Sequence, residues 1–250
     1  MQPFNALKQA RYGHMLYNVN DKYIGGSFEH YGEFSEGECD FFRKVIRAGD
    51  IVLDIGANIG SHTVFFAKHG CTVLAFEPQR IVFQTLCANI ANNSIAHAYC
   101  YNVGLGDEHG HIDVPELDPY KPNNFGGLSI EGHDGGDIVP IQTIDGIGLP
   151  RCEFMKIDVE GMEEKVLRGA VKTIEAFHPV LYVENDRQEK SESLMLFIKN
   201  LGYKMAWHKP FLFNPDNFAG NPENIFPNIV SSNLICVHSD DPHCEELLNG

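Results

Sequence analysis

The chain has 250 residues, of which 43% are hydrophobic, and a formal net charge of −15 at pH 7. This length and apolar content can build the core of one large α/β domain. The strong negative charge, without any run of lysine or arginine, argues against a protein that binds nucleic acid.

The N-terminal stretch MQPFNALKQARYGHML lacks the long apolar run of a signal peptide, and no segment approaches the length of a membrane span. Seven cysteines are scattered along the chain, and none belongs to a cluster with zinc-ligand spacing. We therefore expect a cytoplasmic protein whose partners include neither a membrane nor a nucleic acid. Its oligomeric state stays open, with a homodimer as one alternative.

Residues 1–48 are predicted to be an N-terminal extension that ends in a helix. Ser35 and Glu38 have the spacing of a capping box, in which both side chains bond the backbone at the start of a helix. Phe41 and Phe42 follow on the side of this helix that would face the core. Residues 49–250 are predicted to form one domain.

From Asp50 onward, short apolar runs alternate with helical patterns, which is typical of βαβ units and a mainly parallel sheet. The predicted strands are 51–55, 71–77, 98–103, 152–159 and 178–184, followed by two closing strands, YKMAW and SNLICVH. Residues 107–141 interrupt this alternation around a Gly- and Asn-rich segment. They predict an inserted β hairpin.

Two later segments carry further expectations. One helix is expected after residue 159, since four apolar residues recur there at helical spacing: Met162, Val166, Ala170 and Ile174. Residues 208–230 form a Pro-, Asn- and Phe-rich loop that is longer than most connections in compact domains. It is predicted to be a lid or binding loop. Aromatic residues in this loop and directly before it either line an acceptor pocket or form a hydrophobic plug: Trp207, Phe211, Phe213 and Phe218.

The segment Asp54-Ile-Gly56-Ala-Asn58-Ile-Gly60 lies between the first predicted strand and its helix. Glycines in such a turn let a polar ligand approach backbone N–H groups at a helix N-terminus. Glu77 follows Gly56 by 21 residues, at the end of the second strand, where an acid can bind two ribose hydroxyls.

Three ligand classes compete for this turn. Asn58 and Ser61 break the G-x-G-x-x-G fingerprint of NAD and FAD sites, and Ser61-His62 breaks the P-loop pattern. S-adenosylmethionine (SAM) fits better, with its adenosine on Glu77 and its methionine amino group near Asp54. His62, one turn into the helix, either reaches this site or lies on the helix surface.

Four acids lie at the carboxyl ends of neighbouring predicted strands: Asp54, Glu77, Asp158 and Glu184. Ligands of an open parallel sheet bind beyond the carboxyl ends of the strands, and acids buried there need a cation, a metal or hydrogen-bond donors. Asp158 is the candidate that binds or deprotonates the methyl acceptor, although an aspartate here can also cap a helix. Glu160 is either a second acceptor ligand or an acid in the first turn of that helix.

A metal-dependent alternative uses the same acids. Asp158, Glu184 and the neighbouring Asn185 offer the oxygen ligands that Mg²⁺ prefers, in a layout similar to that of catechol-type methyltransferases. A metal would lower the pKa of an acceptor hydroxyl. The catalytic candidates are therefore Asp158, Glu160 and Glu184, with or without Mg²⁺.

Four blocks resemble the FkbM family of SAM-dependent methyltransferases, in its order and spacing: YGEFSEGE (31–38), GDIVLDIGANIGSHTVFFA (49–67), FEP (76–78) and KIDVEGMEEKVLRGA (156–170). The resemblance covers residues 24–184. It implies a class I methyltransferase fold, which is a Rossmann-like three-layer α/β sandwich. Its seven-stranded, mostly parallel sheet has the order 3-2-1-4-5-7-6, with an antiparallel last strand.

The resemblance also implies that SAM is the methyl donor and that a hydroxyl of a small-molecule acceptor, a saccharide or another secondary metabolite, is methylated. By position, the SAM loop would comprise Asp54, Gly56, Asn58 and Gly60, with Glu77 and Pro78 at the ribose. Asn102, Gly104 and Leu105 would lie near the adenine. Tyr31 and Glu33 would close over the methionine end, although a purely structural role for Tyr31 is an equal alternative. Asp158 would face the methyl group.

Departures from the family pattern are few. Met162 stands where small residues are common, and loop 208–230 is particular to this chain, so the acceptor is left open. N-methylation or carboxyl methylation of a peptide is one alternative. A SAM-binding module without turnover and a nicotinamide-dependent oxidoreductase are two others.

Overall fold

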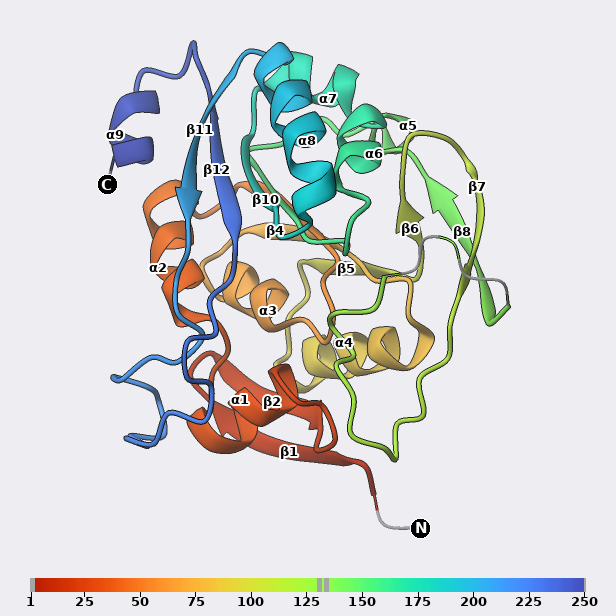
Figure 1. Ribbon diagram of the computed structural model, residues 1–250, viewed down its shortest axis with the longest axis vertical. Helices are drawn as coiled ribbons and strands as arrows, with labels where there is room; N and C mark the ends of the chain where they lie inside the picture. The colour runs from red at the N-terminus through yellow and green to blue at the C-terminus, as the bar shows by residue number, and fades with distance from the viewer. Residues whose placement is uncertain (1–2, 130–131, 133–134, 250) are drawn as a thin grey trace.

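Seven strands form the central sheet of the computed structural model, in the order β11-β12-β10-β9-β3-β4-β5 (Figure 1). They are β3 (Ile51–Ile55), β4 (Thr72–Phe76), β5 (Ala98–Tyr101), β9 (Phe154–Ile157), β10 (Val180–Glu184), β11 (Tyr203–His208) and β12 (Asn233–His238). β12 pairs antiparallel with both β10 and β11, and the other pairs are parallel. Counted along the chain, the order is 6-7-5-4-1-2-3, which confirms the sheet predicted from the family resemblance. The structure describes residues 3–129, 132 and 135–249.

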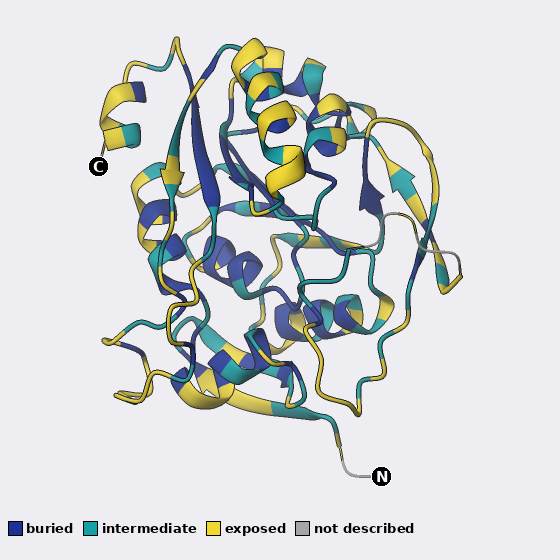
Figure 2. Cartoon of the chain, in the orientation of Figure 1, coloured by how far each residue is buried: buried dark blue, intermediate teal, exposed yellow. Residues whose placement is uncertain are grey.

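Helices cover both faces of the sheet, because its central strands are apolar on both sides. α5 (Ile144–Ile147), α6 (Glu163–Arg168), α7 (Val171–Phe177) and α8 (Gln188–Asn200) contribute to the core on one face. α2 (Glu36–Val45), α3 (Ser61–Lys68) and α9 (Cys244–Asn249) contribute to the core on the other. Successive residues of β3 pack into opposite cores: Leu53 packs in the core with α6 and α8, and Val52 packs in the core with α2 and α3. Figure 2 shows β12 buried along its length, whereas α8 is exposed on its outer side.

The single helix expected after residue 159 is instead two short helices, α6 and α7. The break falls at Gly169, where a Cβ would lie only 1.9 Å from the carbonyl oxygen of Gly106. Only glycine leaves room here for the neighbouring backbone. The four apolar residues of the predicted face are all buried: Met162, Val166, Ala170 and Ile174.

A second, smaller sheet contains β6 (Gly104–Leu105), β7 (Gly110–Val114) and β8 (Asp137–Gln142). β7 and β8 pair antiparallel, which confirms the predicted hairpin, and β6 adds a short parallel pairing to β8. Residues 130, 131, 133 and 134 of the predicted insertion lie outside the described residues.

The N-terminal region holds a hairpin that was not predicted. β1 (Asn5–Ala10) and β2 (Gly13–Asn18) pair antiparallel, and α1 (Ile24–Tyr31) follows them. Met15 and Tyr17 of β2 are buried in one hydrophobic cluster with residues of α4 (Arg80–Asn92). The extension therefore shares a core with a helix of the main domain.

The capping box predicted at Ser35 is wrong. Ser35 has a φ of 52°, in the left-handed region, and its buried hydroxyl forms no hydrogen bond among the described residues. α2 does begin at Glu36. The side chain of Glu38, however, accepts a hydrogen bond from Asn233 Nδ2 at 2.9 Å and leaves the start of the helix uncapped.

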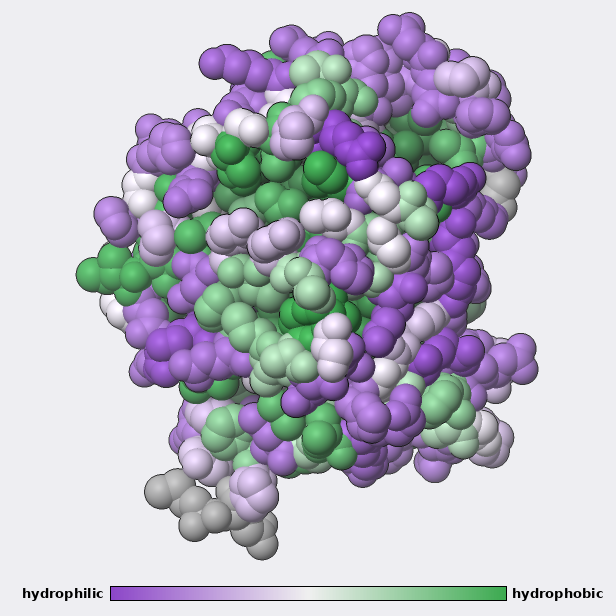
Figure 3. Space-filling view, turned by 180° about the vertical axis from the view of Figure 1, so that it is seen from behind, coloured by the Kyte–Doolittle hydropathy of each residue, from purple (hydrophilic) through white to green (hydrophobic). Residues whose placement is uncertain are grey.

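The back of the molecule has a hydrophilic border, with hydrophobic residues gathered toward its middle (Figure 3). Large apolar side chains that are exposed include Tyr99 and Tyr101 of the edge strand β5. Over the described part of the chain, no helix combines the length and the apolar character needed to cross a bilayer.

Candidate active site

A cavity of about 440 Å³ lies at the carboxyl ends of β3, β4, β9 and β10. Its wall is built from the turns that follow these strands, together with the start of the small sheet and the last residues of the loop before β12. This is the edge of an open parallel sheet where ligands bind.

The turn after β3 contributes backbone to this wall through Gly56, Ala57 and Asn58. Gly56 has a φ of +75°, and a Cβ there would lie 1.7 Å from the carbonyl oxygen of Asp158. Only glycine allows the turns after β3 and β9 to approach so closely. Gly60 also has a positive φ, of +87°, but it packs against Leu86 and does not line the cavity.

Glu77 joins the turns that follow β3 and β4. Its carboxylate accepts hydrogen bonds from the backbone N–H of Asn58 at 2.9 Å and of Gln79 at 2.8 Å. Burial raises the pKa of Glu77 to about 7, although these two N–H groups lower it. Both Glu77 and the adjacent Pro78 line the cavity, as a ribose-binding position requires.

Of the residues predicted near the adenine, Gly104 and Leu105 line the cavity and Asn102 does not. The amide of Asn102 donates to the carbonyl oxygens of Glu77 and Pro78, both at 2.9 Å. Asn102 thus supports the turn after β4 from outside the cavity.

Asp54 lies beneath the cavity and not on its wall. Its side chain is fully buried and accepts a hydrogen bond from Thr63 Oγ1 at 2.6 Å. Burial raises the pKa of Asp54, while the nearby Lys156 ammonium lowers it. Its Oδ1 lies 3.9 Å from the Nζ of Lys156, which does line the cavity.

Lys156 is a cavity residue to which we assigned no role from the sequence. It is 3% exposed, and its Nζ lies 3.0 Å from Asp158 Oδ2. Burial lowers the pKa of Lys156, but the negative charges of Asp158, Asp54 and Glu38 outweigh it and raise the pKa overall. The sequence spacing could have predicted this pairing. Lys156 and Asp158 are two residues apart in an extended segment, and side chains at that spacing point to the same side.

Three carboxylates that were predicted as catalytic come together on the cavity wall: Asp158, Glu160 and Glu184. One oxygen from each lies within 4.8 Å of the others. Asp158 pairs with Lys156, and Glu160 accepts a hydrogen bond from Arg187. Glu184 Oε2 is buried without a hydrogen-bond partner in the described part of the protein.

Crowding of these acids changes their protonation. Burial and the charge of Asp158 raise the pKa of Glu160 to about 8, although Arg187 lowers it. Burial, with the charges of Asp158 and Glu160, raises the pKa of Glu184 as well. The cavity wall therefore carries acids that stay partly protonated near neutral pH until a cation or a hydrogen-bond donor arrives.

The Mg²⁺ ligand set that was predicted is not assembled. The amide of Asn185 donates to Ser191 Oγ at 2.9 Å, and Asn185 does not line the cavity. Asp158 and Glu160 already have cationic side chains as partners. Of the predicted ligands, only Asp158 and Glu184 thus come together, with Glu160 in place of Asn185.

The turn between Asp158 and α6 is held by another residue. Glu163 accepts hydrogen bonds from the backbone N–H of Val159 at 3.2 Å and of Gly161 at 3.0 Å. α6 begins only at Glu163, so neither Asp158 nor Glu160 lies at its N-cap or in its first turn. Both helix-punctuation alternatives are therefore wrong.

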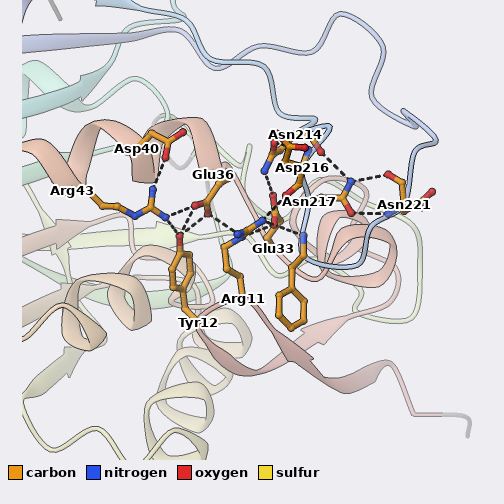
Figure 4. Close-up of polar contacts among 11 residues, drawn as sticks. Arg11, Tyr12, Glu33, Glu36, Asp40, Arg43, Asn214, Asp216, Asn217 and Asn221 are labelled. Carbon is orange, nitrogen blue, oxygen red and sulfur yellow. Dashed lines mark hydrogen bonds and ion pairs between the residues drawn. The ribbon is translucent and has the colours of Figure 1, made fainter.

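Tyr31 and Glu33 lie outside the cavity and hold the long loop of residues 209–232. Glu33 accepts hydrogen bonds from Arg11 Nε at 2.7 Å, Asn214 Nδ2 at 2.8 Å and the Phe218 N–H at 2.7 Å (Figure 4). The hydroxyl of Tyr31 donates to the carbonyl of residue 223 at 2.9 Å and accepts from the N–H of residue 225 at 2.8 Å. These contacts fasten the long loop to the N-terminal region, beside which it lies in Figure 1.

The long loop lines the cavity with residues other than the predicted aromatics. Phe211 is 63% exposed, and Trp207 and Phe218 are also exposed. Phe213 packs against Tyr31, with ring centroids 5.3 Å apart. Of the four aromatic residues predicted either to line a pocket or to form a hydrophobic plug, this one therefore fits the plug. The loop residues on the cavity wall are Leu212, Ile229, Val230, Ser231 and Ser232.

Comparison with known proteins matches residues 54–205 to a family model described as the methyltransferase FkbM domain. The hexuronic acid methyltransferase AglP of Haloferax volcanii is 29% identical, over 58% of this chain and 61% of that protein. The 31-O-demethyl-FK506 methyltransferase FkbM of Streptomyces tacrolimicus is 45% identical, over 50% of this chain and 60% of that protein. The chain thus spans about 60% of the length of these curated relatives.

One solved structure shows the shared fold. The methyltransferase FkbM of Methylobacillus flagellatus KT superposes with a TM-score of 0.53 at 19% sequence identity. The superposition covers 79% of this chain and 50% of the other.

Proposed function

This chain belongs to the FkbM family of methyltransferases, and we propose that it transfers a methyl group from SAM to a hydroxyl oxygen of a small-molecule acceptor. The observation that carries this proposal is the contact between two turns. Gly56 and Asp158 meet backbone to backbone on the cavity wall, with Glu77 on the same wall.

The residues on this wall fit SAM. The backbone of Gly56, Ala57 and Asn58 would hold its methionine end, because this turn lines the cavity and lies against the backbone of Asp158. Glu77 would bind the ribose hydroxyls, and Leu105 would contact the adenine. When bound, SAM supplies a methyl group that is activated by a positively charged sulfur.

The chain's own part in the reaction is to align the acceptor and receive its proton. Alignment of two reacting groups can supply about 7 kcal/mol or more of the barrier reduction. Asp158 is only partly buried and lines the cavity beside Lys156, so its carboxylate can accept a hydrogen bond from the acceptor hydroxyl. We assign it the role of orienting that hydroxyl.

The names of two relatives support a hydroxylated acceptor. One is a hexuronic acid methyltransferase, and the other acts on a demethylated form of FK506. A saccharide or another secondary metabolite is therefore our proposed acceptor class. Methylation of a peptide nitrogen or carboxyl group has no comparable support.

Two measurements test the proposal. Calorimetry with S-adenosylhomocysteine (SAH) should show binding, and methyl-labelled SAM should label at least one acceptor in a panel of methyl glycosides and polyhydroxylated macrolides. Binding of SAH without transfer to any acceptor would indicate a non-catalytic SAM-binding module. Binding of NADH in place of SAH would point to an oxidoreductase.

A further inference from the structure

Two buried polar side chains face the cavity beside the long loop: Glu38 of α2 and His62 of α3. Glu38 is 5% exposed and His62 is 6% exposed, so His62 does not lie on the helix surface. His62 Nε2 lies 3.3 Å from Glu38 Oε2, yet it has no hydrogen-bond partner among the described residues. A buried polar atom without a partner is costly. This atom therefore points to a ligand group that the chain does not supply.

Glu38 has no structural task at its own helix. The residue caps nothing in α2, and its Oε1 accepts a hydrogen bond from Asn233 Nδ2 at 2.9 Å. Its second oxygen, Oε2, is the one directed at His62. A carboxylate oxygen and an imidazole nitrogen thus lie side by side on the cavity wall, each able to bond one oxygen of a ligand.

We propose that Glu38 and His62 form the acceptor subsite, and that the Glu38 carboxylate takes the proton of the hydroxyl that is methylated. His62 Nε2 hydrogen-bonds a neighbouring hydroxyl of the same acceptor and positions it. The acceptor class is then an alcohol with adjacent hydroxyls, such as a saccharide or another polyol. This inference rests on the proposed methyltransferase function.

In the transfer, the acceptor oxygen forms a bond to the methyl carbon while the bond between that carbon and sulfur breaks. The electron pair of the broken bond stays on sulfur, which leaves SAH, and the proton of the hydroxyl moves to Glu38. Glu38 releases this proton to solvent after the product departs. Asp158 keeps its orienting role because its carboxylate is already paired with Lys156.

The surroundings of Glu38 suit proton transfer near neutral pH. The titratable and charged groups that face it are Lys156 and Asp158 after β9, His62 on α3 and Tyr182 on β10. Burial raises the pKa of Glu38 to about 7, although Lys156 lowers it. A base works best when its pKa lies near the working pH.

The test compares the Glu38→Gln variant with the wild-type protein, using a methyl glycoside that the wild type methylates. Glutamine keeps the shape and can still accept the hydrogen bond from Asn233. We expect kcat to fall about 100-fold or more, as the loss of a general base does. The SAH dissociation constant should stay within about threefold, because the SAM wall is untouched.

Glu36→Gln is the matched control. Glu36 is a buried acid of the same helix, bonded to Tyr12 and Arg43 outside the cavity, and its replacement should leave kcat unchanged.

His62→Gln should raise the acceptor KM more than it lowers kcat. In the wild type, kcat should rise with pH near 7, because only the deprotonated Glu38 carboxylate can take the proton. This rise should be absent in the Glu38→Gln variant.

Two results would overturn the proposal. One is a Glu38→Gln variant whose kcat and pH profile match the wild type. The other is a parallel loss of SAH affinity and activity, which would make Glu38 a structural residue of the cofactor site. A wild-type protein that methylates no member of the panel would instead refute the proposed function on which this subsite depends.

Discussion

Each acid at the carboxyl end of the sheet has its own partners, and these partners determine what the side chain can do. Glu77 accepts two backbone N–H groups and so holds two turns together. Glu163 caps the turn before α6, and Glu160 is engaged by Arg187. Asp158 faces the cavity beside the Lys156 ammonium. The acids are therefore not interchangeable, and single substitutions can separate their tasks.

The Asp158→Asn variant should lose kcat by about tenfold, because a neutral amide oxygen accepts a weaker hydrogen bond from the acceptor hydroxyl than a carboxylate does. The SAH dissociation constant should change little, because the backbone of residue 158 is kept. Steady-state kinetics and calorimetry would measure the two effects. The melting temperature should be recorded as a control, since Lys156 loses a buried partner. Full activity in a well-folded variant would contradict the orienting role.

Gly56→Ala tests the contact between two turns. A Cβ at this position meets the Asp158 carbonyl oxygen at 1.7 Å, so the turns must separate and SAH binding should weaken by about tenfold or more. Gly49→Ala is the matched control, because Gly49 also has a positive φ, of +94°, but nothing lies within 4 Å of its Cβ position. Calorimetry should show normal SAH affinity for the Gly49 variant. Equal weakening in both variants would mean that backbone strain, and not the contact, is responsible.

At the scale of elements, the long loop is the part of the site that depends on distant segments. It supplies Leu212, Ile229 and Val230 to the cavity. From the N-terminal side, Glu33 accepts from Asn214 and Arg11 donates to the carbonyl oxygen of Asp216. Hydrogen bonds to charged groups are each worth about 1.5–3 kcal/mol. The loop is therefore fastened by contacts that lie well away from the reacting groups.

Glu33→Gln should loosen the long loop, because a glutamine cannot replace the charge that faces Arg11 and cannot accept all three of the hydrogen bonds. We expect the acceptor KM to rise by about tenfold, with SAH affinity unchanged and with faster amide hydrogen exchange in residues 209–232. Asp40→Asn serves as the control, since the pairing of Asp40 with Arg43 is exposed and does not involve the loop (Figure 4). Unchanged exchange in the Glu33 variant would contradict the fastening role.

At the scale of the whole molecule, electrostatics restricts the acceptor. Among the described residues, the cavity wall carries six acidic side chains and two basic ones: Glu38, Glu77, Asp158, Glu160, Glu184 and Asp186, with Lys156 and Arg187. Burial raises the pKa of several of these acids, so the main source of negative potential is the net charge of the chain, −15. An anionic acceptor is repelled by this charge and would also have to enter a site lined with acids, which is unfavourable and slows association.

We therefore predict that a neutral methyl glucoside is a better acceptor than the matching methyl glucuronide. The ratio of their kcat/KM values should be about tenfold or more at low salt and should shrink as salt is added. A preference for the methyl glucuronide would contradict this prediction. It would instead indicate an acceptor like that named for the hexuronic acid methyltransferase relative.

Much of the fold was predictable because it depends on local patterns. The apolar runs around Leu53 and Met155 are long enough to be buried strands, and the family blocks supplied their order in the sheet. The β1–β2 hairpin was missed because its strands are short and partly polar. Only the alternation of Met15 and Tyr17, both buried, marked the inner side of β2.

The sequence by itself determined the class of the protein, through the Gly56 turn, Glu77 and the block around Asp158, because these positions are set by strand ends close to them in the chain. Only the tertiary structure decided what Glu33 and Glu38 do. Both belong to the same short block, yet one binds a loop some 180 residues later and the other faces His62 in the cavity. Sequence spacing predicted a helix cap for Glu38, since a cap depends on neighbours three residues away. Its actual partners are brought to it by the packing of α2 against α3 and β12, which no local pattern records.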